Sequence, residues 1–345
     1  MNCKASFGIA LAVLIILASS PACRIRNTIN SYLTTVVPAT ENRTGVDSGT
    51  PSGSTSFSPD CSSNIQINGL DRHYFVHLPP NFNKDKSWPL VFCLHGGGGE
   101  GKGINGLTGY NAVADSQGFI VVYPDAIEHN WNDGRGDLMV RSHIENIDDV
   151  AFISALIDKL AGEYNIDRKM VYATGISNGA LMSHRLGCEL ADKIAAIAPV
   201  AGNIPEKMAP IWTSSRPMPV LIINGTDDPL VPWDGGYITA FGQKRGRVLS
   251  VADTVKFWAG KNGCSALPET VQLPDVSSMD GTTVTRESYS GCRNNADVLL
   301  YAVKGGGHTW PGGFQYLPAA IVGKTCRDFN ASEVIWEFFK QHPLK

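Results

Sequence analysis

The sequence predicts an α/β protein with a mostly parallel sheet that helices cover on both faces. Short apolar runs rich in β-formers alternate with segments of helical period along the chain. Buried strands that helices separate usually pair in parallel, because a parallel crossover needs about the length of a helix. With 345 residues, 43% of them hydrophobic, the chain can build such a core. No long insertion separates the strands, so no large lid domain is expected.

Each predicted element rests on its own apolar pattern. The strands are expected over residues 74–78, 90–94, 119–123, 170–173, 194–200, 220–223 and 298–303. The helices are expected over residues 148–164, 178–191, 251–261 and 331–341. No helical segment separates the strands before residue 94, so these first strands are expected to be antiparallel.

The first 60 residues differ in composition from the rest. Lys4, an apolar run over 7–17, and small residues such as Ala22 are typical of a secretory signal, which we expect over residues 1–22. Residues 23–60 are rich in Ser, Thr, Gly and Pro and are expected to form a disordered tether before a catalytic domain over 61–345. The protein is therefore expected to be secreted or periplasmic. Cys23 follows the signal directly and leaves a lipid anchor as an alternative.

Six cysteines follow the predicted tether: Cys61, Cys93, Cys188, Cys264, Cys292 and Cys326. An exported protein can form disulfides. Cys264 and Cys292 flank a stretch with strand and turn character in polar, glycine-containing surroundings, and they are the favoured pair. Cys93 and Cys188 lie in an apolar strand and a helix, where buried thiols are expected. A bridge between Cys61 and Cys326 stays open, but no local pattern supports it.

A single serine stands between two glycines in the stretch Gly175-Ile176-Ser177-Asn178-Gly179. A predicted strand precedes it and a predicted helix follows it, which is the context of a nucleophile turn. Glycine two places on either side leaves room for that turn. The simpler alternative is an ordinary strand-to-helix turn with Ser177 as the helix N-cap.

A serine nucleophile needs a base and an acid that orients the base, in the chain order Ser, Asp or Glu, His. His308 lies in a glycine-rich loop after a predicted strand and is the expected base. Asp228 precedes Pro229 in a turn after another strand and is the favoured acid. Asp227 is the next candidate, and Asp125, which also ends a strand, is a further one.

The transition state also needs N–H donors for its oxyanion. We expect them from the backbone of Asn178, just after the nucleophile, and of Gly97, in the loop after residue 94. This loop also fits a phosphate-binding pattern up to Lys102, but Gly103 stands where Ser or Thr would have to meet magnesium. No His-Glu-x-x-His or paired Cys-x-x-Cys motif occurs, so neither metal nor cofactor is expected. The net charge of -3 and the lack of a basic run argue against nucleic acid as a partner.

With these motifs the chain resembles exported esterases of the polyhydroxybutyrate depolymerase and feruloyl esterase type, within the α/β-hydrolase superfamily. The resemblance spans about residues 68–339 and rests on "HLPPNF", "PLVFCLHGGGG", "VVYPDAIEHNWND", "IDDVAFISALIDKL", "VYATGISNGALMSHRL", "AAIAPVAG", "NGTDDPLVPW" and "GGGHTWPGG". It implies an α/β-hydrolase fold and a triad of Ser177, Asp228 and His308. A family disulfide near the Asn-Gly-Cys segment also supports the pair Cys264–Cys292.

The substrate is predicted less sharply than the chemistry. Trp310 is expected to line the cleft, and Trp131 and Trp233 could join it or simply pack the loops. Aromatic walls suit a feruloyl ring, a sugar or the methyl-bearing face of a polyester. The resemblance slightly favours feruloyl or acetyl esters of plant-wall polysaccharide, with polyhydroxybutyrate or its oligomers as the alternative. A peptidase and a non-catalytic binding protein are less favoured.

Overall fold

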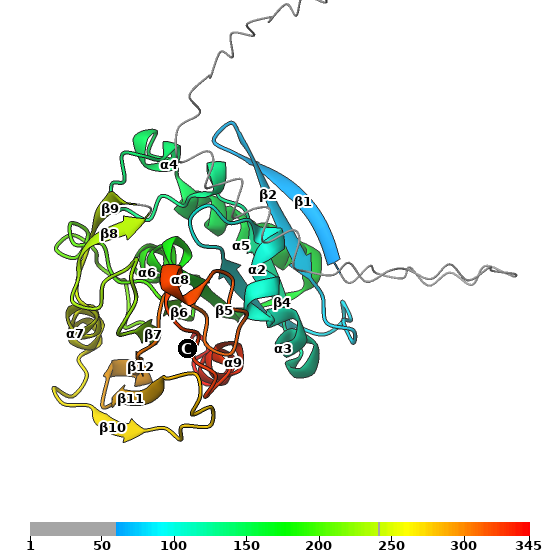
Figure 1. Ribbon diagram of the computed structural model, residues 1–345. Coiled ribbons are helices and arrows are strands. Elements are labelled where there is room, and N and C mark those ends of the chain that lie inside the picture. Colours follow the sequence, from blue (N-terminus) through cyan, green and yellow to red (C-terminus); the bar gives the residue numbers. More distant parts are fainter. Residues whose placement is uncertain (1–59, 241) are drawn as a thin grey trace, which may run out of the picture.

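The computed structural model describes residues 60–240 and 242–345 (Figure 1). The predicted signal over 1–22, Cys23 and all but the last residue of the predicted tether lie outside this part. That last residue, Asp60, begins the first strand, β1. No helix in the described part is long and apolar enough to cross a membrane.

The described residues form a ten-stranded sheet in the order β1-β2-β4-β3-β5-β6-β7-β12-β11-β10. Its six central strands, from β4 to β12, are parallel, and the pairs at either end are antiparallel. Figure 1 shows β1 and β2 at one end of the molecule and β10 and β11 at the other. The strands are β1 Asp60–Ile67, β2 Leu70–His77, β3 Trp88–Leu94, β4 Ile120–Pro124, β5 Ile166–Ile176, β6 Ala196–Val200, β7 Val220–Gly225, β10 Glu269–Gln272, β11 Thr283–Tyr289 and β12 Val298–Lys304. A separate hairpin joins β8 Gly236–Ala240 and β9 Gln243–Val248.

Helices cover both faces of the sheet, as the alternation of elements predicts. The helices are α2 Gly101–Thr108, α3 Tyr110–Gln117, α4 Arg141–Ile144, α5 Asp149–Tyr164, α6 Asn178–Glu189, α7 Val251–Asn262, α8 Ala319–Val322 and α9 Ala331–Phe339, with 3-10 turns η1 Ile127–His129 and η2 Arg293–Asn295. Residues of α5, α6 and α7 pack in one core cluster and residues of α3 and α9 in the other. Successive residues of β7 alternate between the two clusters, because side chains on a strand point to opposite faces.

The expectation for the first strands is only partly confirmed. β2 runs antiparallel to β4, and β3 runs opposite to β2. The two are not neighbours, however, because β4 lies between them, and β3 pairs in parallel with β4 and β5. The helices α2 and α3 after β3 provide the crossover that brings β4 back between them.

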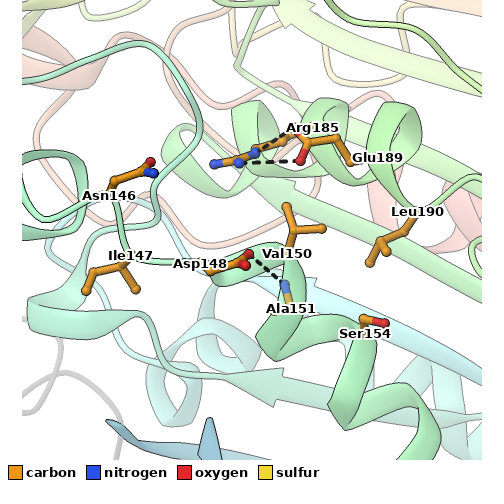
Figure 2. A pocket seen from close by; sticks show the side chains of 9 residues that line it. All are labelled: Asn146, Ile147, Asp148, Val150, Ala151, Ser154, Arg185, Glu189 and Leu190. Carbon is orange, nitrogen blue, oxygen red and sulfur yellow. Dashed lines mark hydrogen bonds and ion pairs between the residues drawn. The ribbon is translucent and has the colours of Figure 1, made fainter. Parts of the chain in front are cut away.

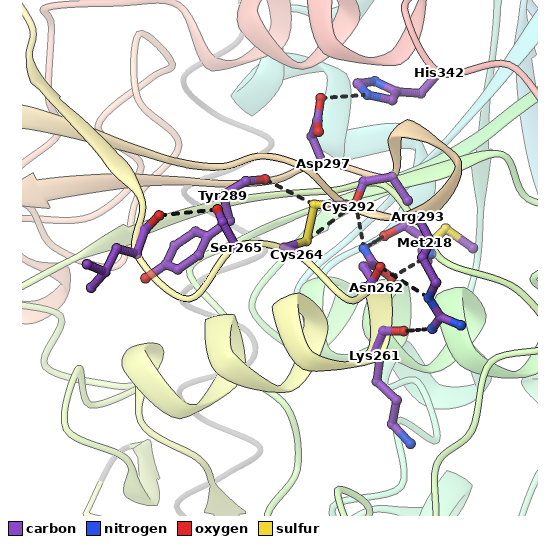
Figure 3. The surroundings of a disulfide bond; sticks show 12 residues. Met218, Lys261, Asn262, Cys264, Ser265, Tyr289, Cys292, Arg293, Asp297 and His342 are labelled. Atoms are coloured by element: carbon purple, nitrogen blue, oxygen red, sulfur yellow. Dashed lines mark hydrogen bonds and ion pairs between the residues drawn. A yellow bond between two sulfur atoms is a disulfide. The ribbon is translucent and has the colours of Figure 1, made fainter.

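The predicted disulfide between Cys264 and Cys292 is present (Figure 3). It joins the turn after α7 to the turn after β11, 28 residues apart in sequence. Cys93 and Cys188 are buried thiols, as expected, and burial raises the pKa of each to about 12. No disulfide joins Cys61 and Cys326 within the described residues.

Candidate active site

Ser177 lies on a sharp turn between β5 and α6. Its φ and ψ angles are 58° and −122°, a strained conformation for a residue with a side chain. A Cβ atom on Gly175 would lie 2.6 Å from the carbonyl oxygen of Leu94, and one on Gly179 would lie 2.3 Å from the same oxygen. Both glycines are therefore required by the close approach of β3. The Ser177 hydroxyl makes no capping hydrogen bond, which argues against a purely structural N-cap role.

Asp228 and His308 are joined by a short hydrogen bond. Asp228 follows β7, His308 follows β12, and these two strands are neighbours in the sheet. The Nδ1 atom of His308 lies 2.7 Å from Oδ2 of Asp228, and both side chains are buried. A carboxylate can only accept, so Nδ1 carries the proton and Nε2 is left free of it. Nε2 of His308, the nitrogen without a proton, therefore faces away from Asp228.

The carboxylate of Asp228 is itself fixed by its own turn. Its Oδ1 atom accepts hydrogen bonds from the backbone N–H groups of Leu230, at 2.8 Å, and Val231, at 2.9 Å. The loop that carries His308 is held as well, because the Tyr316 hydroxyl donates to the His308 carbonyl at 3.0 Å. Both members of the pair thus have fixed positions before any substrate binds.

The two alternative acids have other roles in the structure. Asp227 is exposed, and its carboxylate accepts from the hydroxyl of Thr226. Asp125 accepts from the backbone N–H of Gly101 at the start of α2, at 2.6 Å. Burial raises the pKa of Asp125. Neither carboxylate has a hydrogen bond to His308 among the described residues.

Ser177, Asp228 and His308 leave the same edge of the sheet. They follow β5, β7 and β12, which are parallel strands, so their carboxyl ends share that edge. Within the described residues, Ser177 Oγ makes no hydrogen bond to His308. Such catalytic contacts are often long in a protein without substrate and tighten when it binds.

The two expected oxyanion donors lie beside the serine. A Cβ atom on Gly96 would lie 3.4 Å from Cβ of Ser177, and one on Gly97 would lie 3.7 Å from Cβ of Asn178. Asn178 is the first residue of α6, where backbone N–H groups have no partner within the helix. In the described part of the chain, the N–H of Gly97 also has no hydrogen-bond acceptor. Two unpaired donors therefore adjoin the serine.

His95 holds the Gly97 loop and was not predicted as a site residue. Its Nδ1 atom donates to the carbonyl of Gly96 at 2.8 Å, while Nε2 accepts from the N–H of Ala126 at 3.1 Å. Burial lowers the pKa of His95 to about 4, so the ring is neutral at ordinary pH. Its position directly before the glycine run was a signal in the sequence, but a histidine there could equally have been a core residue.

Two of the three predicted substrate tryptophans are wrong in that role. Trp310 and Trp131 have no exposed surface, so neither can present a ring to a substrate here. The indole of Trp310 donates to the hydroxyl of Ser332, and that of Trp131 donates to the carbonyl of His95. Trp233 is half-buried against the core and stays a candidate.

Among the residues that the structure describes, one group of side chains has the spacing of metal ligands. Ligand atoms of Asp280, Cys326 and Asp328 lie within 4.8 Å of one another. Backbone N–H groups already occupy both carboxylates, from Thr282 and Arg327 on Asp280 and from Val276 and Ser277 on Asp328. These contacts account for the cluster as a brace between loops.

A shallow groove of about 500 Å³ lies between α5 and α6 (Figure 2). Arg185, on its wall, lies eight residues beyond Ser177, which is about 12 Å along the helix. Its polar groups are already engaged: Arg185 pairs with Glu189, and Asp148 caps α5 through the N–H of Ala151. None of Ser177, Asp228 and His308 lines this groove.

Comparisons with known proteins agree with this geometry. The model of a family described as "Esterase PHB depolymerase" matches residues 72–230. A protein of Nocardia uniformis subsp. tsuyamanensis named "Putative esterase NocK" is 32% identical over 282 residues, which cover 79% of this chain and 80% of that protein. The chain belongs to the polyhydroxybutyrate depolymerase and feruloyl esterase-like family. It is a carboxylic-ester hydrolase with the α/β-hydrolase fold.

Further relatives of this esterase carry more specific names. "Feruloyl esterase B" of Piromyces equi is 30% identical over 243 residues, which are 69% of this chain but only 42% of that longer protein. Among solved structures, the acetyl xylan esterase of Aspergillus awamori superposes with a TM-score of 0.50 at 17% identity. That match covers 72% of this esterase and 94% of the other chain, and it shows a shared fold.

Proposed function

We propose that this esterase is an exported serine hydrolase that works through an acyl-enzyme on feruloyl or acetyl esters of plant-wall polysaccharide. The observation that carries the catalytic part is the buried hydrogen bond between His308 and Asp228, on loops that leave the same sheet edge as Ser177. Export rests on the signal-like pattern of residues 1–22 and the disulfide between Cys264 and Cys292.

In the proposed mechanism, Ser177 Oγ attacks the ester carbonyl carbon while Nε2 of His308 takes its proton. Asp228 keeps the other ring nitrogen protonated and stabilises the imidazolium that forms. The N–H groups of Gly97 and Asn178 bind the oxyanion of the tetrahedral intermediate. His308 then protonates the leaving alcohol as its bond to the acyl carbon breaks. In the second half of the reaction, a water molecule gives a proton to His308 and attacks the acyl carbon, and His308 returns that proton to Ser177 Oγ as the acid is released.

Replacing the nucleophile tests the mechanism. Ser177→Ala should lower the turnover of p-nitrophenyl butyrate by at least about 10⁴-fold without changing the melting temperature by more than a few degrees. Ser154→Ala, on α5 in the groove of Figure 2, makes the same substitution at a site that contains none of the three proposed catalytic residues. It should keep wild-type turnover. Full activity in Ser177→Ala would refute a serine mechanism.

The substrate class needs a separate measurement. Methyl ferulate, acetylated xylan and 3-hydroxybutyrate oligomers should be compared by kcat/KM under one set of conditions. We expect the first two to exceed the third, in line with the printed names of the feruloyl and acetyl xylan esterases. The family description favours polyhydroxybutyrate as the second candidate, and a clear preference for the oligomers would establish that candidate instead.

A further inference from the structure

The two proposed oxyanion donors belong to separate segments of the chain. Gly97 lies in the loop after β3, and Asn178 lies at the start of α6. Donors stabilise a developing charge only when they are held in place before the reaction, because reorganisation would cost part of the gain. Something must therefore fix the spacing between these two segments. The stretch from His129 to Trp131 contacts both of them.

The first set of contacts holds the Gly97 loop. The carbonyl of His129 accepts from the N–H of Gly98 at 2.8 Å, and its ring Nδ1 donates to the carbonyl of Gly99 at 3.0 Å. The indole Nε1 of Trp131 donates to the carbonyl of His95 at 3.0 Å. The loop is thus bonded to this stretch on both sides of Gly97.

The second set of contacts holds the start of α6. The side-chain oxygen of Asn178 accepts from the backbone N–H of Trp131 at 2.7 Å, and its amide nitrogen donates to the carbonyl of Trp131 at 3.0 Å. That nitrogen also donates to Asp133 at 2.7 Å. Asn178 is 2% exposed and Trp131 has no exposed surface, so water cannot replace these bonds.

The stretch is itself kept rigid. Glu128 and His129 both have positive φ angles, 46° and 62°, which surrounding contacts must hold in residues with side chains. The next residue along, Asn132, donates from its N–H to the buried carboxylate of Asp149, which also binds Arg72. The segment between the two donors is therefore anchored to α5 and β2 as well.

We propose that Trp131 is a positioning residue, which together with the side chain of Asn178 fixes the two oxyanion donors relative to each other. This inference rests on the proposed function, since it assumes that Gly97 and Asn178 bind the oxyanion. It gives Trp131 a role in place of the substrate contact that the sequence predicted. It also assigns the Asn178 side chain a task that is distinct from that of its backbone N–H.

Asn178→Ala tests the proposal because it keeps the backbone N–H and removes only the side-chain hydrogen bonds to Trp131 and Asp133. The chain offers a matched control in Asn262, whose amide makes the same two bonds to the backbone N–H and carbonyl of Met218, beside the disulfide (Figure 3). Both substitutions should lower the melting temperature. Only Asn178→Ala should lower kcat, by about 10- to 100-fold with KM changed by less than about twofold.

A second pair of variants covers the case in which Asn178→Ala does not fold. Trp131→Phe keeps an aromatic ring at this buried position and removes the N–H that donates to the carbonyl of His95. Trp258→Phe does the same elsewhere, since the indole of Trp258 donates to His184 at 3.0 Å in the core. We expect kcat of Trp131→Phe to fall by about 10-fold and that of Trp258→Phe to stay at the wild-type value.

The outcomes separate this inference from the proposed function. Wild-type kcat in Trp131→Phe, or an equal fall in each variant and its control, would overturn the positioning role while Ser177→Ala stayed inactive. Turnover at the wild-type rate in Ser177→Ala would overturn the serine mechanism, and the positioning role with it. A selective fall in kcat in Trp131→Phe, shared by Asn178→Ala where it folds, supports the proposal.

Discussion

Asp227 and Asp228 are neighbours in sequence, yet their carboxylates have different surroundings. Asp228 is buried, accepts from two backbone N–H groups and binds His308, whereas Asp227 is exposed and binds Thr226. Asp228 closes the turn through Pro229 by accepting from the N–H groups of Leu230 and Val231, whereas the Asp227 side chain lies in solvent. The two residues therefore allow the proposed acid to be tested against a control of the same type.

Asp228→Asn should lower kcat by about 10³- to 10⁴-fold, because an amide can no longer hold His308 in the tautomer with a free Nε2. Asp227→Asn should change kcat by less than about twofold. Steady-state turnover of a p-nitrophenyl ester at one pH measures both. A large loss in Asp227→Asn with normal turnover in Asp228→Asn would reverse the assignment.

Candidate site residues could be located in the sequence where chemistry restricts the choice of residue type. A serine between two glycines and a histidine in a glycine-rich loop are unusual enough to stand out, and the structure places both at the sheet edge expected for them. The burial of Trp131 and Trp310 could not be predicted, because it depends on contacts with distant residues such as His95 and Ser332. The hydrogen bonds between the Asn178 side chain and the backbone of Trp131 could not be predicted for the same reason.

The central parallel strands were the easiest elements to predict. They are buried on both faces, so they appear in the sequence as continuous apolar runs. The edge strands β1 and β10 are short or polar and carry partly exposed side chains, which removes that signal. The helices α2 and α3 were missed too, since their sequences contain glycine and polar residues that favour helices weakly.

The disulfide joins the turn after α7 to the turn after β11, which are distant in the sequence. Replacing both cysteines by serine should lower the free energy of unfolding by about 3.6 kcal/mol, because the bond restricts a 28-residue span of the unfolded chain. Urea unfolding of the variant and the wild type measures this loss. Turnover in the absence of urea should be unchanged, and wild-type stability in the variant would contradict the prediction.

The stability of the folded protein should depend on pH, because the rings of His95 and His184 are buried and held neutral. Burial lowers the pKa of His95 to about 4 and that of His184 to about 3. In the unfolded chain both would take up protons below about pH 6.5. The unfolded state then binds more protons than the folded state, so the free energy of unfolding falls as pH drops from about 6.5 towards 4.

His184→Gln should weaken this pH dependence. The variant is expected to be less stable than the wild type at pH 7, because it loses contacts to Trp258 and Gly202. This difference in the free energy of unfolding should be about 2–3 kcal/mol smaller at pH 4.5 than at pH 7. Keeping the buried ring neutral costs the wild type about 1.4 kcal/mol for each pH unit below 6.5. Urea unfolding at both pH values measures it, with the exposed His73→Gln as a control. Parallel pH profiles for wild type and His184→Gln would contradict the prediction.

The first described residue and Ser177 lie at opposite edges of the sheet. Asp60 pairs with His77, and His77 pairs with Val121 near the start of β4, so β1 begins at the amino ends of the parallel strands. Ser177, by contrast, follows the carboxyl end of β5. A carrier protein or solid support joined directly at Asp60 would therefore meet the enzyme on the side away from the sheet edge that carries Ser177. Immobilisation through that end should leave access for a bulky polymer.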